Sequence, residues 1–271
     1  MTSTRIYFFT GSGNSYATAR DLAARLEAAE LAAITPLLGK EAVYDETPHI
    51  GFVFPIYGGR PPKFIVEWLK RFRPGKDSVC FAVCTCGIAP GQCHPTVDAI
   101  LKASGSGLTW GFSVIQPQAG IGSSKINTPE EVARRLAGQK TKIDEIARYI
   151  SAGGPPLMEK SGPFSEFLSS QTLKVLPTLG KLIGYLITKG MKGMKFHAGD
   201  ECDGCGVCER LCPAANISLV DGKALWLDKC MGCMGCYHWC PRNAVKNVDL
   251  DMIQSPHPEV TLNELLGYAP R

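Results

Sequence analysis

The first 150 residues alternate short apolar runs with longer stretches that mix apolar and charged residues. Four runs have the length and character of buried strands: 6–9, 49–54, 79–84 and 110–115. Three of the intervening stretches have the apolar spacing of helices: 16–29, 63–72 and 93–102. Thr128, followed by Pro129 and Glu131, is typical of a helix start and predicts a further helix to about Ile150. This alternation predicts an α/β doubly wound domain, in which helices cover both faces of a parallel sheet.

Three loops follow predicted strands and contain the residues best suited to bind a ligand. They begin at Thr10, Pro55 and Cys84. Ligands of such sheets bind beyond the carboxyl ends of the strands, so we expect these loops to converge on one site.

The first loop, Thr10-Gly11-Ser12-Gly13-Asn14-Ser15, is rich in glycine and hydroxyl groups. Glycines let backbone N–H groups close on an anion, and the N-terminus of the following helix adds partial positive charge. The loop lacks the Gly-Lys-Ser/Thr ending of a P-loop and the third glycine of a dinucleotide fingerprint. It favours a terminal phosphate monoester, with an ordinary strand-to-helix turn as the alternative.

Eight of the twelve cysteines form two near-copies of one pattern close to the C-terminal end of the sequence. Each copy has three cysteines spaced by two residues and, after three more residues, a Cys-Pro pair. The copies are Cys202, Cys205, Cys208, Cys212-Pro213 and Cys230, Cys233, Cys236, Cys240-Pro241. Bacterial two-cluster ferredoxins hold two [4Fe–4S] clusters with this spacing, and the fourth cysteine of each run ligates the other cluster.

The expected ligand sets therefore cross between the two runs. One cluster is expected on Cys202, Cys205, Cys208 and Cys240, and the second on Cys230, Cys233, Cys236 and Cys212. Zinc knuckles and a disulfide framework are the alternatives, although zinc sites usually come as two separated cysteine pairs, often with histidine.

Other cysteines and histidines are expected to have structural roles. Cys80, Cys84, Cys86 and Cys93, even together with His94, have a spacing that fits no tight chelate, which favours buried thiols over a third metal site. Since eight cysteines satisfy two clusters, we expect His197 and His238 at the surface.

These patterns divide the chain into a first domain at 1–152, a helical connector at 153–194, a cluster domain at 195–251 and a tail at 252–271. The connector segment Phe164–Ile187 is expected to pack between the domains, with contact to a membrane surface as the alternative. The tail is expected to form a short helix or strap over the cluster domain.

Charge and composition limit the partners and the cellular compartment that we expect for the protein. The net charge is +4, whereas the stretch from Lys195 to Asp251 holds eight acidic and six basic residues. The positive excess elsewhere favours acidic redox partners or the chain's own cluster domain. No basic aromatic stripe indicates nucleic acid, and no apolar run reaches the roughly 20 residues of a membrane span. Without a visible secretory signal, the cysteine-rich chain is expected in a reducing cytoplasm, and its clusters favour an anaerobic setting.

Residues 1–152 resemble a short-chain flavodoxin, and the whole chain resembles the bacterial and archaeal flavodoxin-related ferredoxins. The resemblance implies bound FMN beside two [4Fe–4S] clusters. It implies phosphate contacts from the first loop, ring contacts from the second and contact with the ring edge from the third, with Tyr57 stacking on the ring. The residues concerned are Thr10, Ser12, Gly13, Asn14, Ser15, Pro55, Ile56, Tyr57, Gly58, Thr85, Cys86 and Gly87. Arg60 is expected either to steady the reduced ring or to be solvated. The third loop lacks the acidic and aromatic residues common in simple flavodoxins.

The leading hypothesis is an electron-transfer protein that relays electrons between FMN, two clusters and a redox partner protein. One alternative is a flavin-dependent reductase, in which the clusters feed a small-molecule acceptor. A second is a docking module that no longer holds flavin. The sequence contains no convincing pair of acid–base residues, so whether the chain is an enzyme with its own substrate stays open.

Overall fold

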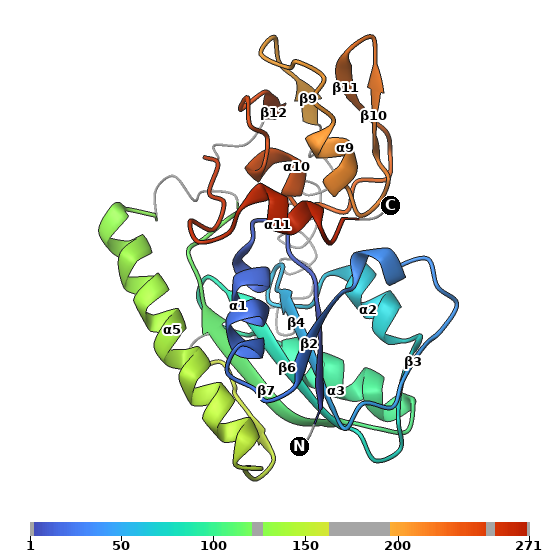
Figure 1. The fold of residues 1–271 in the computed structure, drawn as a ribbon, viewed down its shortest axis with the longest axis vertical. Coiled ribbons are helices and arrows are strands. Elements are labelled where there is room, and N and C mark those ends of the chain that lie inside the picture. The colour runs from blue at the N-terminus through green and yellow to red at the C-terminus, as the bar shows by residue number, and fades with distance from the viewer. Residues whose placement is uncertain (1–2, 121–126, 163–195, 248–252, 270–271) are drawn as a thin grey trace, which may run out of the picture.

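A six-stranded parallel sheet organises the first part of the chain (Figure 1). In this computed structural model the described residues are 3–120, 127–162, 196–247 and 253–269, so the predicted connector Phe164–Ile187 lies outside them. The strands lie in the order β2-β1-β4-β6-β7-β8, and all neighbouring pairs are parallel. Their bounds are Thr4–Phe8 (β1), Ala29–Ala33 (β2), His49–Pro55 (β4), Val79–Cys86 (β6), Leu108–Ile115 (β7) and Leu157–Met158 (β8). The first five have the strand order of a flavodoxin-like sheet, as predicted.

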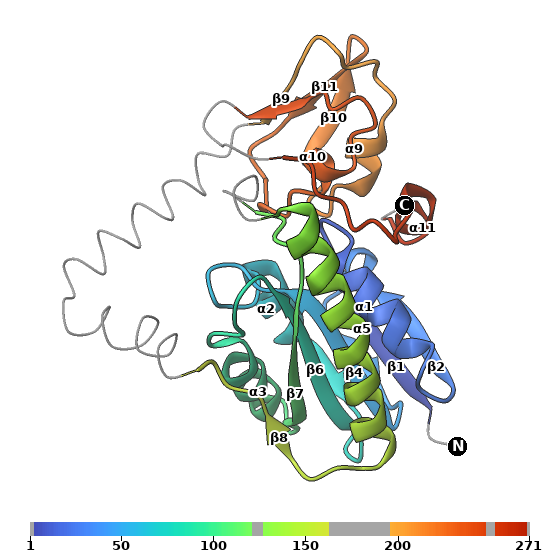
Figure 2. The same ribbon diagram turned by 90° about the vertical axis from the view of Figure 1, so that its left-hand side faces the viewer.

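Helices cover both faces of this sheet (Figure 2). On one face, Ile6 and Phe8 of β1 belong to the core formed with α1 (Asn14–Ala23) and α5 (Pro129–Ser151). On the other face, Tyr7 and Phe9 belong to the core formed with α2 (Lys63–Leu69) and α3 (Cys93–Ala103). Burial on both faces explains the mostly apolar runs 6–9, 50–54 and 79–84 along β1, β4 and β6.

Two predicted helices are too long at their C-terminal ends. Helix α1 ends at Ala23, and Ala29–Ala33 forms the edge strand β2 instead. Ala28, with φ of 48°, turns the chain, and pairing with β1 overrides the helical preference of the alanines. Helix α2 ends at Leu69, because Phe72–Pro74 forms β5 and pairs with β3 (Val43–Asp45). Beyond β7, the two-residue strand β8, which was not predicted, extends the sheet at its edge.

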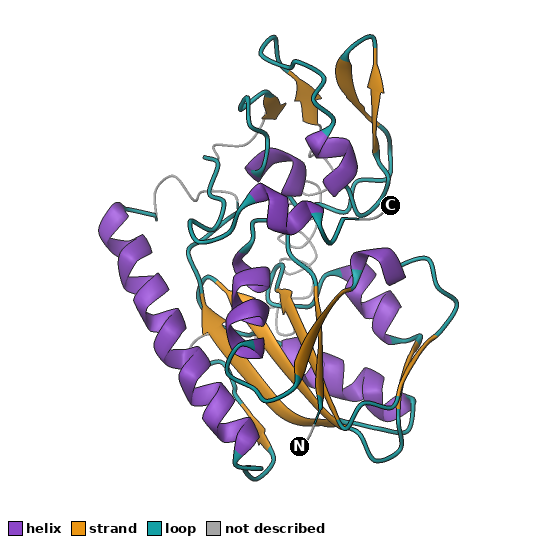
Figure 3. Ribbon diagram, in the orientation of Figure 1, coloured by secondary structure: helices purple, strands orange, loops and turns teal. Residues whose placement is uncertain are grey.

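The cysteine-rich part is a small α+β module (Figure 3). Its elements are β9 (Phe196–Ala198), α9 (Val207–Leu211), β10 (Ile217–Val220), β11 (Lys223–Trp226), α10 (Gly235–His238) and β12 (Val245–Asn247). Strands β10 and β11 form an antiparallel hairpin, and β12 pairs antiparallel with β9. The module lies beyond the carboxyl ends of the parallel strands (Figure 1). Its buried apolar residues form two small clusters, so it has little core of its own.

The tail contains the predicted short helix, α11 (Leu262–Leu266), opened by a capping box between Thr261 and Glu264. As predicted, the tail contacts the cluster domain. The Gln254 side-chain amide donates to the carbonyls of Tyr237 and Cys240 at 2.8 and 3.1 Å, and α11 lies against α9. The tail also docks on the larger domain, which was not predicted: Leu265 is buried in the core formed with α1 and α5, and the Tyr268 ring lies edge-on to Phe8 at 5.0 Å. Apolar burial therefore ties the tail to both parts of the chain. Within the described ranges, no helix is both long and apolar enough to cross a membrane.

Candidate cofactor sites

A cavity of about 300 Å³ lies at the carboxyl edge of the sheet, within the size range of small-molecule sites. All the residues predicted for the flavin site line it except Gly13: Thr10, Ser12, Asn14, Ser15, Pro55, Ile56, Tyr57, Gly58, Thr85, Cys86 and Gly87. Gly13 instead faces the second part of the chain, since a Cβ there would lie 3.0 Å from Trp239 and 3.1 Å from His257. The three predicted loops therefore do converge.

The first loop leaves backbone N–H groups free for an anion. Gly13 has a left-handed φ of 98°, and its N–H donates to the Thr10 hydroxyl at 2.9 Å. No described residue accepts a hydrogen bond from the N–H groups of Gly11 or Ser12. Helix α1 begins immediately afterwards at Asn14, which adds the partial positive charge of a helix N-terminus. These groups fit the terminal phosphate of FMN.

Two side chains of this loop also tie the cavity walls together. The Asn14 side-chain amide donates to the carbonyl of Pro117 at 2.9 Å. The hydroxyls of Ser15 and Thr85 share a hydrogen bond of 2.7 Å, so one of the two O–H groups remains free to donate to a ligand. Direct phosphate contacts from Thr10, Ser12, Asn14 and Ser15 stay a prediction.

The loops expected around the ring differ in character. Pro55 is the last residue of β4 and not part of a loop, and residues 56–58 follow it. Tyr57 and Arg60 form a tight turn with backbone hydrogen bonds in both directions, and Arg60 is exposed. Thr85 and Cys86 belong to the end of β6 and not to a loop. Burial raises the pKa of the Tyr57 hydroxyl, and the nearby Cys233 raises it further.

Sequence reasoning missed two parts of the cavity wall: 116–120 and 232–234. The first follows β7, so the strand-end rule that found the other loops would have found it. The second comes from the cysteine-rich module, and no local pattern in the sequence indicates it.

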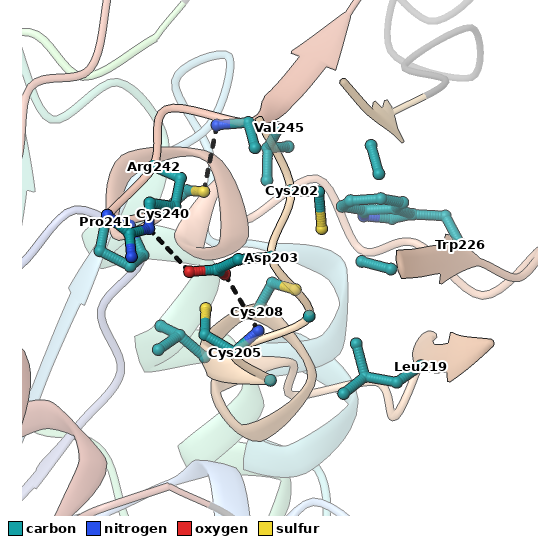
Figure 4. Close-up of a pocket in the computed structure, with 16 residues that line it drawn as sticks. Cys202, Asp203, Cys205, Cys208, Leu219, Trp226, Cys240, Pro241, Arg242 and Val245 are labelled. Carbon is teal, nitrogen blue, oxygen red and sulfur yellow. Dashed lines mark hydrogen bonds and ion pairs between the residues drawn. The ribbon is translucent and has the colours of Figure 1, made fainter. Parts of the chain in front are cut away.

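One group of four cysteines surrounds a cavity in the small module (Figure 4). Its members are Cys202, Cys205, Cys208 and Cys240. Trp226 and Leu219 line the same cavity. Burial, together with the nearby thiols of the other three cysteines, raises the pKa of the Cys208 thiol to about 11.

The other four cysteines line a second cavity: Cys212, Cys230, Cys233 and Cys236. Burial, together with the nearby thiols of Cys212 and Cys230, raises the pKa of the Cys233 thiol to about 12. Each cavity thus takes three cysteines from one run and one from the other, which is the grouping expected for two crossed clusters. Thiolates are the usual ligands of iron–sulfur clusters, so this donor set fits them. Among the described residues, no three His, Cys, Asp or Glu side chains are placed to hold one metal ion.

The two halves of the module repeat the same backbone geometry at an offset of 28 positions, the offset from Cys202 to Cys230. Gly204 and Gly232 have φ of 70° and 68°, and Ala215 and Asn243 have φ of 45° and 50°. Backbone N–H groups reach sulfur at matching places: Asn216 N to Cys212 Sγ at 3.3 Å, and Ala244 N to Cys240 Sγ at 3.2 Å. Such N–H···S contacts tune the potential of a bound cluster.

The first cysteine group lies near an ion pair at the surface. Arg242 contacts Asp203 at 2.7 Å and lowers the pKa of its carboxyl group. Asp203 also accepts from the backbone N–H of Cys205 at 3.2 Å (Figure 4). Cys205 is exposed, so this side of the first cysteine group is accessible from the surface.

The remaining cysteines are buried, as predicted: Cys80, Cys84, Cys86 and Cys93. His197 is exposed, as predicted. The surface position expected for His238 is wrong, because it is 2% exposed and its Nε2 lies 3.0 Å from the Ala119 carbonyl. Burial lowers the pKa of His238 to about 4, so the neutral ring serves as an interdomain hydrogen-bonding group.

The cysteine-rich part of the chain matches a known family. Residues 201–245 match the family model of the 4Fe-4S dicluster domain. None of the curated protein sequences compared with the chain is significantly similar to it.

Three solved structures resemble the first part of the chain. An FMN-dependent NADH-azoreductase from Bacillus anthracis in complex with FMN shares 8% identity over 55% of this chain and 99% of its own, with a TM-score of 0.38. A flavodoxin from the domain Archaea shares 10% identity over 54% of this chain and 99% of its own, with a TM-score of 0.29. Rubredoxin oxygen:oxidoreductase from Desulfovibrio gigas shares 11% identity over 56% of this chain, which spans only 37% of that protein, with a TM-score of 0.30. The strand order, and not these similarities, supports the flavodoxin-like fold.

Proposed function

We propose that this chain is an electron-transfer protein that holds one FMN and two [4Fe–4S] clusters and exchanges electrons with a redox partner protein. The main support is the position of Cys233, which lines both the cavity at the edge of the sheet and the second cysteine cavity. One residue therefore borders both cofactor sites, and electrons need no collision between separate proteins to pass between them.

Different residues would bind the flavin phosphate, the flavin ring and the clusters. The first loop binds the phosphate through N–H groups, and residues 55–58, 85–87 and 116–120 surround the ring. Eight cysteines hold the clusters, with one crossed ligand in each set. When bound, FMN supplies one- and two-electron chemistry and each cluster supplies one-electron chemistry. We also propose that the protein works in a reducing cytoplasm with little oxygen, because clusters of this kind are held by free thiolates.

Anaerobic purification with measurement of iron, sulfide and flavin tests this function. About eight iron atoms and one FMN per chain are expected, together with a paramagnetic signal after dithionite treatment. Zinc at the cysteines, or no resonance signal from reduced protein, would overturn the electron-transfer role. Full iron content without flavin binding, even after FMN is added, would instead favour a docking module.

A reductase of a small molecule is a second candidate, because the ring side of the cavity has an open wall. Gly58 is exposed, and a Cβ built on it would meet no atom within 4 Å. A small acceptor can therefore approach this side. Saturable oxidation of the reduced holoprotein by such an acceptor would favour this candidate.

A further inference from the structure

The loop 232–234 belongs to the second cysteine group, Cys212, Cys230, Cys233 and Cys236. It packs directly on the first loop, residues 10–15, which is the proposed phosphate loop. A Cβ added to Gly11 would lie 1.9 Å from the Cys233 carbonyl oxygen and 3.1 Å from its carbonyl carbon. Only a residue without a side chain allows the two backbones to approach this closely. Residues 232–234 also form one wall of the cavity proposed for the flavin.

The conformation of this loop depends on the second cysteine group. Met234 has a left-handed φ of 62° although it is not glycine, and Gly232 has φ of 68°. The Gly232 N–H donates to Cys230 Sγ at 3.4 Å. The helix that follows has four residues, and the local apolar cluster is small. In modules of this size the bound metal supplies much of the folding free energy, so an empty group would not hold the wall in place.

The corresponding loop of the first group provides a built-in comparison. Residues 204–206 occupy the same place in the repeat, but no residue of 202–208 is part of the flavin cavity wall. A Cβ at Gly204 would instead meet the carbonyl oxygen of Gly222, at 2.5 Å, in the β10–β11 turn. The two groups are alike in local geometry and different in what they contact.

We infer that flavin binding depends on assembly of the second cluster and not of the first, because the second cluster holds residues 232–234 as a wall of the flavin site. This inference rests on the proposed function and adds the order in which the three cofactors lie along the path of the electrons. The second cluster is the immediate neighbour of the flavin, and the first cluster is reached through the second. Since binding free energies are reciprocal, bound FMN also retains the second cluster more firmly.

Crossed ligation allows a sharp test with two matched variants of the full chain. Cys212→Ala removes a ligand of the second cluster although it lies in the first run. Cys240→Ala removes a ligand of the first cluster although it lies beside α10. We expect FMN affinity to fall by roughly tenfold or more in Cys212→Ala and to change less than about twofold in Cys240→Ala. The measurement is an anaerobic FMN titration by fluorescence quenching, with iron content determined for each sample.

Equal FMN affinity in the two variants, whether both high or both low, would overturn the inference. A parent chain that contains full iron but binds no FMN would overturn the proposed function as well, which separates the two failures. Iron release to a chelator provides a second measurement. Added FMN should slow release from Cys240→Ala, which retains the second cluster, and leave release from Cys212→Ala unchanged; the same rates with and without FMN in both variants would contradict the coupling.

Discussion

The indole Nε1 of Trp239 donates a hydrogen bond of 2.9 Å to the carbonyl oxygen of Gly11. The backbone N–H of His257 does the same for the carbonyl of Ser12, at 2.8 Å. The cysteine-rich module and the tail therefore satisfy the carbonyl groups of the phosphate loop from outside. The N–H groups of Gly11 and Ser12 are left for the cavity, so the geometry of the proposed anion site depends on contacts from distant parts of the chain.

Replacement of Trp239 by Phe keeps most of the apolar contact and leaves the Gly11 carbonyl without its donor. We expect a stability loss of about 1 kcal/mol and a several-fold loss of FMN affinity. Trp110→Phe is the matched control, since the Trp110 indole donates to the Gly154 carbonyl at 2.9 Å outside the flavin cavity. Thermal unfolding and FMN titration should show a similar stability loss in both variants and an affinity loss only in Trp239→Phe. An affinity loss of the same size in both would remove the special role of Trp239.

Replacement of Asn14 by Leu removes the hydrogen bond that joins the phosphate loop to the Pro117 carbonyl. Because Asn14 is also at the start of α1, an apolar side chain there disfavours an anion. We expect flavin content to fall by roughly tenfold, since a hydrogen bond at a buried site contributes about 1 kcal/mol or more. Iron content should stay that of the parent protein. Loss of flavin and iron together would contradict a division of the cofactors between the two parts of the chain.

Acid is expected to weaken the docking of the tail through His257. Burial lowers the pKa of this ring to about 4, with Glu259, Arg20, Asp21 and Lys140 as its charged neighbours. Its Nδ1 accepts from the Glu259 N–H at 3.2 Å, so Nε2 carries the proton shared with Gln139 at 3.1 Å. The unfolded ring binds a proton near pH 6.5, so stability is complete above that pH and is lost as pH falls toward 4.

The loss expected from His257 alone between pH 7.5 and 5.5 is about 1 kcal/mol, read as a lower unfolding temperature. His257→Gln should remove this part of the pH dependence and leave the part due to His238, whose pKa burial likewise lowers to about 4. His197→Gln is the control, because His197 is exposed and its loss should leave the dependence unchanged. If His257→Gln shows the same fall with pH as the parent, the titrating group lies elsewhere.

The sequence predicted those features that depend on neighbouring residues, such as buried strands and the spacing of cysteine ligands. Strands such as β4 are buried on both faces, so their apolar runs are unambiguous. Cysteine spacing is set by the size of the cluster, so the grouping around two cavities followed from the motif. The end of α1 was missed because alanine favours a helix while β1 offers a strand partner.

Contacts between distant segments left no local signal. Trp239, His238 and His257 each make a hydrogen bond across the two parts of the chain, and a sequence pattern cannot show which carbonyl each one meets. The wall formed by 232–234 is of the same kind. Tertiary packing therefore adds the part of the site where the two candidate cofactor cavities adjoin.

Arg135 joins two walls of the flavin cavity from behind. Its Nη1 donates to the Gly87 carbonyl at 2.7 Å and to the Gln116 carbonyl at 2.8 Å, while Nε bonds Glu131 at 2.5 Å. Removing this guanidinium frees the loops after β6 and β7 from each other. Hydrogen bonds to a charged group contribute about 1.5–3 kcal/mol, so Arg135→Ala should weaken FMN binding by roughly tenfold or more.

Arg134→Ala is a close control for this variant. Arg134 contacts the same carboxylate at 2.7 Å but is exposed, and among the described residues it bonds no carbonyl of a cavity loop. Surface pairs of this kind contribute little, so the FMN affinity of Arg134→Ala should equal that of the parent. Titration of both variants with FMN at equal iron content distinguishes the two arginines. Equal affinity in Arg135→Ala and the parent would mean that the cavity loops hold their positions without the guanidinium.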